Sequence, residues 1–134
     1  MLQSILAVTI CAEDLPAVEA AYSNYLNYRV VERGTVSAAL AAHWHAPAMT
    51  GRAWLLLQPA SGAPVYLRFV QQTHVAGYAP LKTYGWNAAE LLVQDPDALA
   101  EGLAASPFKI VGPPRNLSSN DNIRAMQVVG PAHE

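Results

Sequence analysis

The stretch Ile5-Leu6-Ala7-Val8-Thr9-Ile10-Cys11 leads directly into Ala12-Glu13-Asp14-Leu15-Pro16, and this combination decides the fold. Residues 5–11 are apolar and rich in β-branched side chains, which predicts a strand. Asp14 is a residue type that caps helix N-termini, and proline is tolerated in a first helical turn. Apolar residues then recur at helical spacing, so we expect an amphipathic helix over 15–26.

Three more strands are expected before residue 73. Their apolar runs cover 28–33, 52–58 and 65–71, and the last two are separated by a turn rich in proline, glycine and serine. A short helix over 36–42 is expected after Gly34. The first half of the chain therefore has the predicted order β-α-β-β-β.

The same order restarts in the second half. A strand is predicted over 86–94, a cap at Asp95, a helix over 97–105, and strands over 108–112 and 123–129. A shift of 81 residues places Asp14 on Asp95, with the strands and helices in phase, as in an internal repeat. We predict one α+β domain over 1–134, with module one at 1–73, a connection at 74–84 and module two at 85–134.

The second module is expected to lack its last strand. The counterpart of the strand 65–71 would begin just beyond residue 134. A sheet without its last strand exposes an edge that favours pairing with another strand. A homodimer, or completion of the sheet by a further chain, is therefore expected.

Two β-α-β-β-β units in one chain resemble the vicinal oxygen chelate superfamily, which includes glyoxalase I, extradiol dioxygenases and bleomycin-resistance proteins. The resemblance lies in residues 6–10, 13–15, the helix through Tyr22 and residues 26–31, and in residues 88–95 with the following helix. It implies two modules that form a curved mixed sheet around a ligand-binding cavity. It also implies the position of a divalent metal, which enzymes of this superfamily hold with side chains from four strands.

The metal-ligand positions that the resemblance implies carry no metal ligands in this sequence. They fall on Ala7, Arg68 and Ala88, and the fourth falls on the strand expected to be missing. Alanine has no donor atom in its side chain, and arginine is a permanent cation that repels a metal ion. We therefore expect no metal and no other cofactor.

Under this register four residues are candidate ligand contacts: Arg68, Glu90, Tyr66 and Thr9. Trp44 is a fifth candidate, as an aromatic that could line an apolar pocket, whereas Trp54 and Cys11 are interpreted as core residues. Arg68 would bind an anionic group such as a carboxylate, with Glu90 orienting the ligand or acting as a base. The alternative is that Arg68 and Glu90 form a structural ion pair, because a charge inside a barrel needs a partner. Tyr66 could donate a hydrogen bond or only pack, and no catalytic residue is identified.

The composition narrows the class of protein. The 134 residues are 52% hydrophobic and 13% charged with a formal net charge of −2, and the eight basic residues are scattered, which argues against a nucleic-acid partner. No apolar stretch reaches the length of a membrane span, and the N-terminus has no signal peptide pattern, so a cytoplasmic location is expected.

Three functions are compatible with these features. The first is a metal-free protein that binds a small organic molecule, with a polar or anionic end, in the sheet cavity. The second is a lyase, isomerase or dioxygenase that uses a metal or acid–base chemistry. The third is a structural half of a larger protein with tandem modules.

Overall fold

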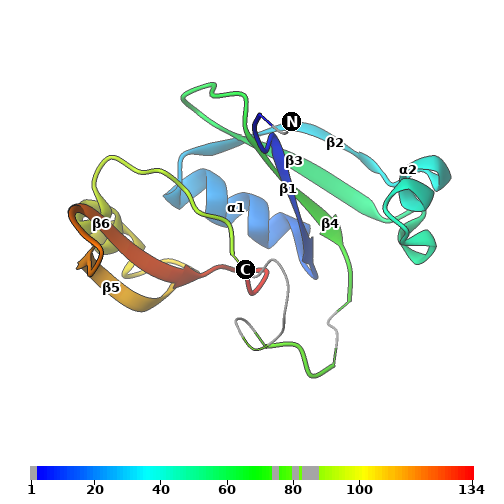
Figure 1. Cartoon of the computed structure of the whole chain (residues 1–134). Coiled ribbons are helices and arrows are strands. Elements are labelled where there is room, and N and C mark those ends of the chain that lie inside the picture. Colours follow the sequence, from blue (N-terminus) through cyan, green and yellow to red (C-terminus); the bar gives the residue numbers. More distant parts are fainter. Residues whose placement is uncertain (1–2, 74–75, 80–81, 83–87) are drawn as a thin grey trace. The chain divides into compact units, whose positions relative to one another are not determined.

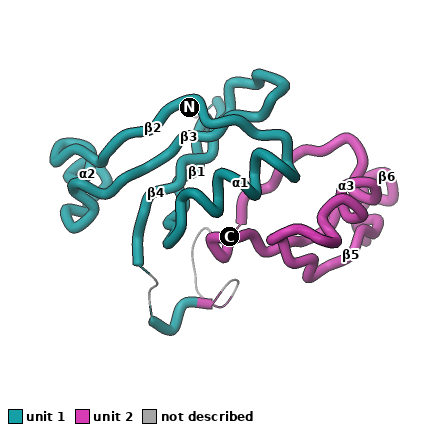
Figure 2. The backbone as a smooth tube through the Cα atoms, turned by 180° about the vertical axis from the view of Figure 1, so that it is seen from behind, with its two compact units in different colours: residues 1–78 teal, residues 79–134 magenta. Residues whose placement is uncertain are grey.

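The computed structural model describes residues 3–73, 76–79, 82 and 88–134. The chain forms two compact units, Met1–Tyr78 and Ala79–Glu134, shown in two colours in Figure 2. The boundary lies within the predicted connection at 74–84. The α+β class predicted from the sequence is confirmed.

Unit 1 contains a four-stranded mixed sheet with one long helix (Figure 1). Its strands are β1 (Ala7–Ala12), β2 (Tyr28–Thr35), β3 (Ala53–Pro59) and β4 (Tyr66–Gln71). They lie in the order β1-β4-β3-β2, in which β1 and β4 are parallel and the other neighbours are antiparallel. The four predicted strands of the first module are thus present, with small shifts at their ends.

Helix α1 (Leu15–Tyr25) begins where the sequence predicts. The Asp14 side chain accepts a hydrogen bond of 2.9 Å from the backbone N–H of Ala17, which satisfies one of the free donors of the first turn. The buried face of α1 contains Val18 and Tyr22, and the Tyr22 ring lies 5.1 Å from that of Phe69 in β4. This contact fixes which face of the sheet α1 covers.

Alternating side chains divide the sheet into two faces. Leu67 and Phe69 of β4 and Leu55 and Leu57 of β3 are buried on the face that α1 covers. Each such side chain contributes about 1.5–3 kcal/mol by leaving water. Residues between them in sequence, including Arg68, must point to the other face, which we call the open face. This is the register predicted for the first module.

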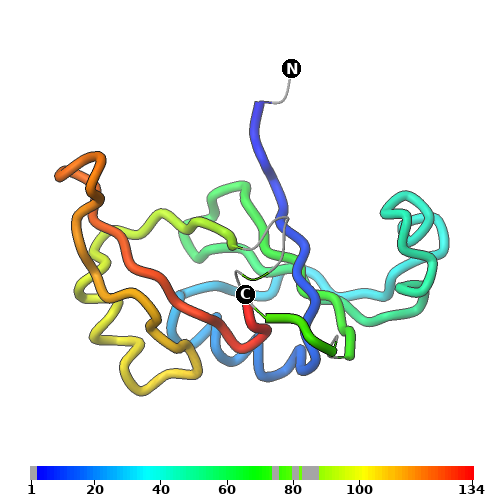
Figure 3. The backbone as a smooth tube through the Cα atoms, turned by 60° about the horizontal axis from the view of Figure 1, so that its bottom comes forward, coloured from blue at the N-terminus to red at the C-terminus, as the bar shows by residue number. Residues whose placement is uncertain are grey.

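Part of the open face is covered by the segment between β2 and β3. Helix α2 (Ala38–His43) and the short 3-10 helix η1 (Pro47–Met49) lie beyond the ends of these strands (Figure 3). Val36, Ala41 and Val70 form a small buried cluster there, and four partly buried side chains pack on it: Leu40, Trp44, Met49 and Trp54. The segment therefore brings Trp44 to the open face, beside Trp54 of β3.

Unit 2 contains helix α3 (Pro96–Leu103) and the antiparallel strands β5 (Lys109–Leu117) and β6 (Asn120–Val129). Asp95 caps α3, as predicted, by accepting hydrogen bonds of 2.9 and 3.0 Å from the N–H groups of Asp97 and Ala98. The core of this unit includes the fully buried Leu103 and Phe108.

Two sequence predictions for the second module are wrong. Residues 88–94 form no strand, while residues 86–87 of the predicted strand 86–94 lie outside the described residues. In unit 1 the strand β1 is held by its parallel neighbour β4, and the described part of unit 2 has no strand in a corresponding place. An alternating apolar pattern alone does not make a strand without a partner.

The second error concerns the predicted strand 108–112, which was expected to end before Pro113-Pro114. Strand β5 continues through both prolines to Leu117. The register with β6 shifts between Gly112 and Arg115, so the prolines fall in an irregular stretch where no ladder hydrogen bond requires their missing N–H groups.

Candidate functional site

Arg68 lies in the middle of the open face of the unit 1 sheet. The strand register pairs it with Thr9 of β1 on one side and with Leu56 of β3 on the other, and Leu56 in turn pairs with Glu32 of β2. The four side chains form one row across the sheet. Thr9 is exposed and Arg68 is half-buried, so the row is accessible at its β1 end.

The guanidinium of Arg68 lies near two tryptophan rings. Its carbon Cζ is 5.5 Å from the ring centroid of Trp44 and 5.6 Å from that of Trp54. Trp44 is the C-cap residue of α2, and Trp54 belongs to β3. Each cation–π contact contributes about 0.5–1 kcal/mol at an exposed site and more when water is excluded. The positive charge of Arg68 therefore lies between two apolar rings.

Gly34 explains the position of Trp54. The two residues pair across β2 and β3, and a side-chain carbon placed at Gly34 would lie 2.7 Å from ring atom Cζ2 of Trp54. Only glycine at position 34 leaves room for the indole in this place. The same ring lies near the guanidinium of Arg68.

Two buried donors in this cluster have no hydrogen-bond partner in the described part of the chain. They are Nε of Arg68 and Nε1 of Trp54. Both nitrogens can only donate. A buried donor without an acceptor costs about 1–3 kcal/mol, and more when the group is charged. An oxygen acceptor placed here would remove this cost, and a negatively charged one would also meet the guanidinium.

The predicted contacts in unit 1 thus gather around Arg68. Trp44 contacts its guanidinium, and Thr9 is its neighbour in the register. Tyr66 is two residues before Arg68 on the same face and is half-buried, beside Ala7 of β1. Two of these residues, Thr9 and Tyr66, were predicted from the face that they share with Arg68, and Trp44 was predicted as an aromatic available to line a pocket.

Glu90, the remaining predicted contact, belongs to unit 2. It is exposed and lies in the irregular segment 88–94. Its predicted pairing with Arg68 would join the two units and stays a prediction. So do the predicted homodimer, the completion of the sheet by a further chain and the cytoplasmic location.

The metal-ligand positions implied by the family resemblance do not fit a metal. Ala7 and Arg68 lie on the open face of adjacent strands and provide a methyl group and a cation. Ala88 is exposed and lies outside any strand. The described residues also contain no group of three or more His, Cys, Asp or Glu side chains that could hold a metal ion. We therefore derive no chemistry through a metal at these positions.

Cys11 lies on the open face near the end of β1. The sequence analysis interpreted it as a small core residue, but it is exposed. Partial burial of the thiol raises its pKa. A raised pKa keeps less of the thiol in its nucleophilic thiolate form, which disfavours Cys11 as a nucleophile.

Sequence reasoning missed Trp54 and Gly34 as parts of the site. It assigned Trp54 to the core, because aromatic residues at strand spacing are usually packed there. The signal that could have revealed the pair is a glycine inside the strand 28–35, since such a glycine often marks a close approach of another group. The pairing of Gly34 with Trp54, however, depends on the hairpin register.

Similar solved structures identify the fold of this chain, whereas sequence comparisons found no match. No protein-family model matches the sequence, and no curated protein matches it. Among solved structures, a member of the glyoxalase/bleomycin resistance protein/dioxygenase superfamily from Sphaerobacter thermophilus is similar at 18% identity, with a TM-score of 0.62 over 98% of this chain and 91% of that one.

Two further structures are similar at low identity. A glyoxalase family protein from Bacillus cereus has 14% identity and a TM-score of 0.70 over 97% of this chain and 88% of that one. The protein SMU.1112c has 17% identity and a TM-score of 0.61 over 99% and 95%. The chain has the glyoxalase-like, vicinal oxygen chelate fold that its sequence pattern predicted.

None of the helices that the structure describes is long and apolar enough to cross a lipid bilayer.

Proposed function

We propose that the chain binds a small organic anion with an apolar body on the open face of the unit 1 sheet, without a metal ion. The observation that carries this proposal is the pair of unpartnered buried donors, Nε of Arg68 and Nε1 of Trp54. A protein that used Arg68 only for its structure would gain by pairing those donors internally. An acceptor that arrives with a ligand pairs them only in the bound state.

The chemistry of the neighbouring groups favours a carboxylate on a flat or apolar skeleton. Charge-assisted hydrogen bonds from a guanidinium to a carboxylate are about twice as strong as neutral ones. The rings of Trp44 and Trp54, with the half-buried Leu56, provide apolar surface around that charge. The exposed hydroxyl of Thr9, next to Arg68, can add a hydrogen bond.

The side chains available at this site favour binding of a ligand without reaction over catalysis. The metal-ligand positions that fall on Ala7 and Arg68 provide no lone pair, and the thiol of Cys11 has a raised pKa. Proteins with this fold have varied chemistry, so the fold alone does not assign an enzyme activity. The site geometry therefore supports sequestration of the ligand.

A thermal-shift experiment tests the anchor. Benzoate is the probe, because it joins a carboxylate to a flat apolar ring, and benzyl alcohol is its uncharged counterpart. We expect benzoate at about 100 times its Kd to stabilise the protein by about 2.7 kcal/mol, which raises Tm by roughly 10 °C, whereas benzyl alcohol has a much smaller effect.

Arg68→Met keeps an apolar stem of similar length and removes the charge. We expect it to weaken benzoate binding about tenfold or more, because a hydrogen bond to a charged group contributes about 1.5–3 kcal/mol. Arg115→Met is the matched control, since Arg115 is an exposed arginine of β5. Equal benzoate shifts in both variants would refute the anchor, and stoichiometric zinc, iron, manganese or nickel in the purified protein would refute the metal-free part.

A further inference from the structure

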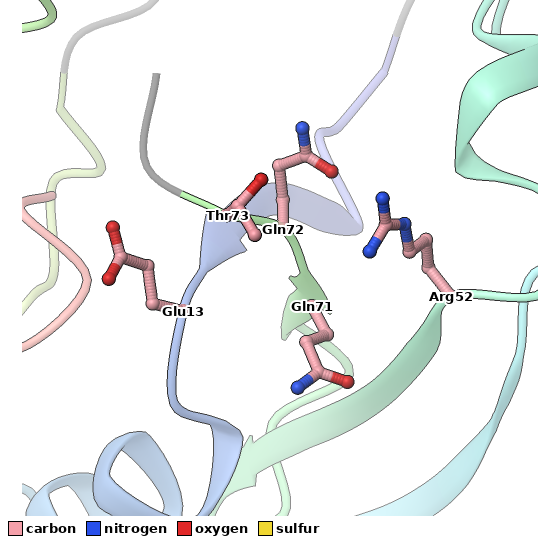
Figure 4. Close-up of a pocket in the computed structure, with 5 residues that line it drawn as sticks. All are labelled: Glu13, Arg52, Gln71, Gln72 and Thr73. Carbon is pink, nitrogen blue, oxygen red and sulfur yellow. The ribbon is translucent and has the colours of Figure 1, made fainter. Parts of the chain in front are cut away.

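A hollow lies apart from the Arg68 site, where the ends of three strands of the unit 1 sheet meet. Parallel strands β1 and β4 end side by side, and the antiparallel strand β3 begins next to the end of β4. Glu13, Gln71, Gln72, Thr73 and Arg52 therefore converge and line a space of about 540 Å³ (Figure 4). Arg68 is not among the lining residues, so this hollow is distinct from the anion site proposed above.

Arg52 brings an unneutralised positive charge to the hollow. Its backbone is fixed by two hydrogen bonds, from its N–H to the carbonyl of Met49 (3.0 Å) and from the N–H of Val36 to its own carbonyl (2.9 Å). Its half-buried side chain makes no ion pair or hydrogen bond with any residue that the structure describes. The backbone of Arg52 is thus fixed at the hollow, and its guanidinium is available to an anionic group.

Gln72 brings an unpaired acceptor. Its backbone N–H donates to the carbonyl of Ala12 over 2.9 Å, which anchors it beyond the end of β4. The side-chain oxygen Oε1 is buried and has no hydrogen-bond partner in the described part of the chain. Figure 4 shows this oxygen on the side of Gln72 that faces Arg52. A buried acceptor of this kind requires a donor, so an anion alone would leave it unsatisfied.

Glu13 places a negative charge across the hollow from Arg52. In Figure 4 the two side chains lie on opposite sides of Gln72 and Thr73. A simple anion would meet Arg52 favourably but would leave the unpaired Gln72 oxygen without a donor. A simple cation would satisfy that oxygen but would be repelled by the Arg52 guanidinium. The hollow therefore favours a molecule that carries both charges close together.

We infer that this hollow binds the head group of a free α-amino acid. The ligand carboxylate pairs with the Arg52 guanidinium, and the α-ammonium group donates to the neighbouring oxygen Oε1 of Gln72. An amino acid joins these two groups through a single carbon, which matches the adjacent placement of a guanidinium and an unpaired acceptor. The Thr73 hydroxyl and the Gln71 amide provide further hydrogen-bonding groups at the rim.

Three small probes of one skeleton test this inference by ¹⁵N–¹H NMR of the full chain. Glycine has both charges, N-acetylglycine only the carboxylate and glycinamide only the ammonium group. We expect glycine to cause saturable shifts of the backbone amide signals of residues 71–73 in the millimolar range, and the other two probes to bind about tenfold or more weakly.

Variants separate a specific site from general charge effects. Arg52→Gln and Gln72→Leu should each weaken glycine binding about tenfold, whereas Gln72→Glu, which keeps an acceptor at the same place, should retain it. Arg68→Met and Arg115→Met should leave the glycine response unchanged. The spectrum of each variant without ligand reports whether it is folded.

Three results would overturn the inference. Equal binding of glycine and N-acetylglycine would show a plain anion site, and equal binding of glycinamide would show a cation site. The absence of saturable shifts with glycine in the folded wild-type protein would show that no amino acid binds here. Loss of glycine binding in Arg68→Met would place the ligand in the other site instead.

Discussion

Trp54 is the residue on which the candidate anion site depends most. It lies against Gly34 on one side and near the Arg68 guanidinium on the other, and it packs on the buried cluster of Val36, Ala41 and Val70. Its own Nε1 is buried without a partner in the described part of the chain. One side chain therefore couples the stability of the hairpin to the position of the anion-binding charge.

The replacement Gly34→Ala tests this coupling. The new methyl group would lie 2.7 Å from the Trp54 ring, so the indole must move. Overpacking of this kind costs about 1–3 kcal/mol, and we expect that loss in the free energy of unfolding measured with urea. The displaced indole should also weaken benzoate binding.

A double variant distinguishes the contact from a backbone effect. Combining Gly34→Ala with Trp54→Phe, whose smaller ring leaves space, should recover part of the loss, so that the two changes are non-additive. Gly102→Ala is the control, because the added carbon there has no neighbour within 4 Å and alanine is favoured over glycine inside α3 by about 1 kcal/mol. If the losses in the free energy of unfolding were additive in the double variant, the contact with Trp54 would not be the reason that alanine is unfavourable at position 34.

At the scale of the elements, α3 is tied to β6 by an ion pair. Arg124 of β6 donates from Nη2 to Oδ1 of Asp97 over 2.7 Å, from Nε to Oδ2 of the same carboxylate, and from Nη2 to the carbonyl of Pro114 over 3.2 Å. The hydrogen bonds from Arg124 lower the pKa of the Asp97 carboxyl below its ordinary value. This interaction connects the helix of unit 2 to both of its strands.

The sign of its pH dependence follows from that shift. Because the pKa of Asp97 is lower in the folded state than in the unfolded state, the stabilisation is present above the unfolded pKa and is lost as pH falls through the folded pKa. The free energy of unfolding of unit 2, measured with urea, should therefore fall between neutral and acidic pH. We expect this fall to be smaller in Arg124→Met than in the wild-type protein.

Salt provides the control for this prediction. The pair is exposed, so high salt should screen it and bring the wild-type protein closer to Arg124→Met at neutral pH. If the two proteins lost stability in parallel down to acidic pH, the Asp97 carboxyl would not be responsible.

At the scale of the whole molecule, the two units differ in how their strands are held. In unit 1 the central strands β3 and β4 each have two neighbours. In unit 2 the sheet has only β5 and β6 among the described residues, and a two-stranded sheet is marginal without other packing. Leu92 of the irregular segment 88–94 is fully exposed at 103%.

Amide hydrogen exchange should reproduce this difference. The amides of Leu55 and Phe69, in the centre of the four-stranded sheet, should exchange slowest, and those of Leu92 and Val93 should exchange at rates near those of an unfolded chain. Protection of Leu92 in the isolated protein would show that residues 88–94 are paired as the strand that the sequence pattern predicts.

Local signals in the sequence determined most of the elements of unit 1 and the helix of unit 2. Asp14 and Asp95 are helix caps because their side chains reach donors only two or three residues away. The alternation through Leu67, Arg68 and Phe69 fixed which side chains face α1, because a strand has a period of two. From that period the sequence also placed a cation, with Thr9 and Tyr66, on the face where a metal ligand was implied.

Only the tertiary structure decided what surrounds that cation. Arg68 meets Trp44 and Trp54 because α2 folds back over the open face and the β2–β3 register brings Trp54 across from Gly34. The convergence of Arg52, Gln72 and Glu13 likewise depends on the order of the strands. Periodicity and capping are short-range properties that a local stretch of sequence contains. The pairing of distant strands is fixed by the packing of the whole sheet, so local sequence patterns do not determine it.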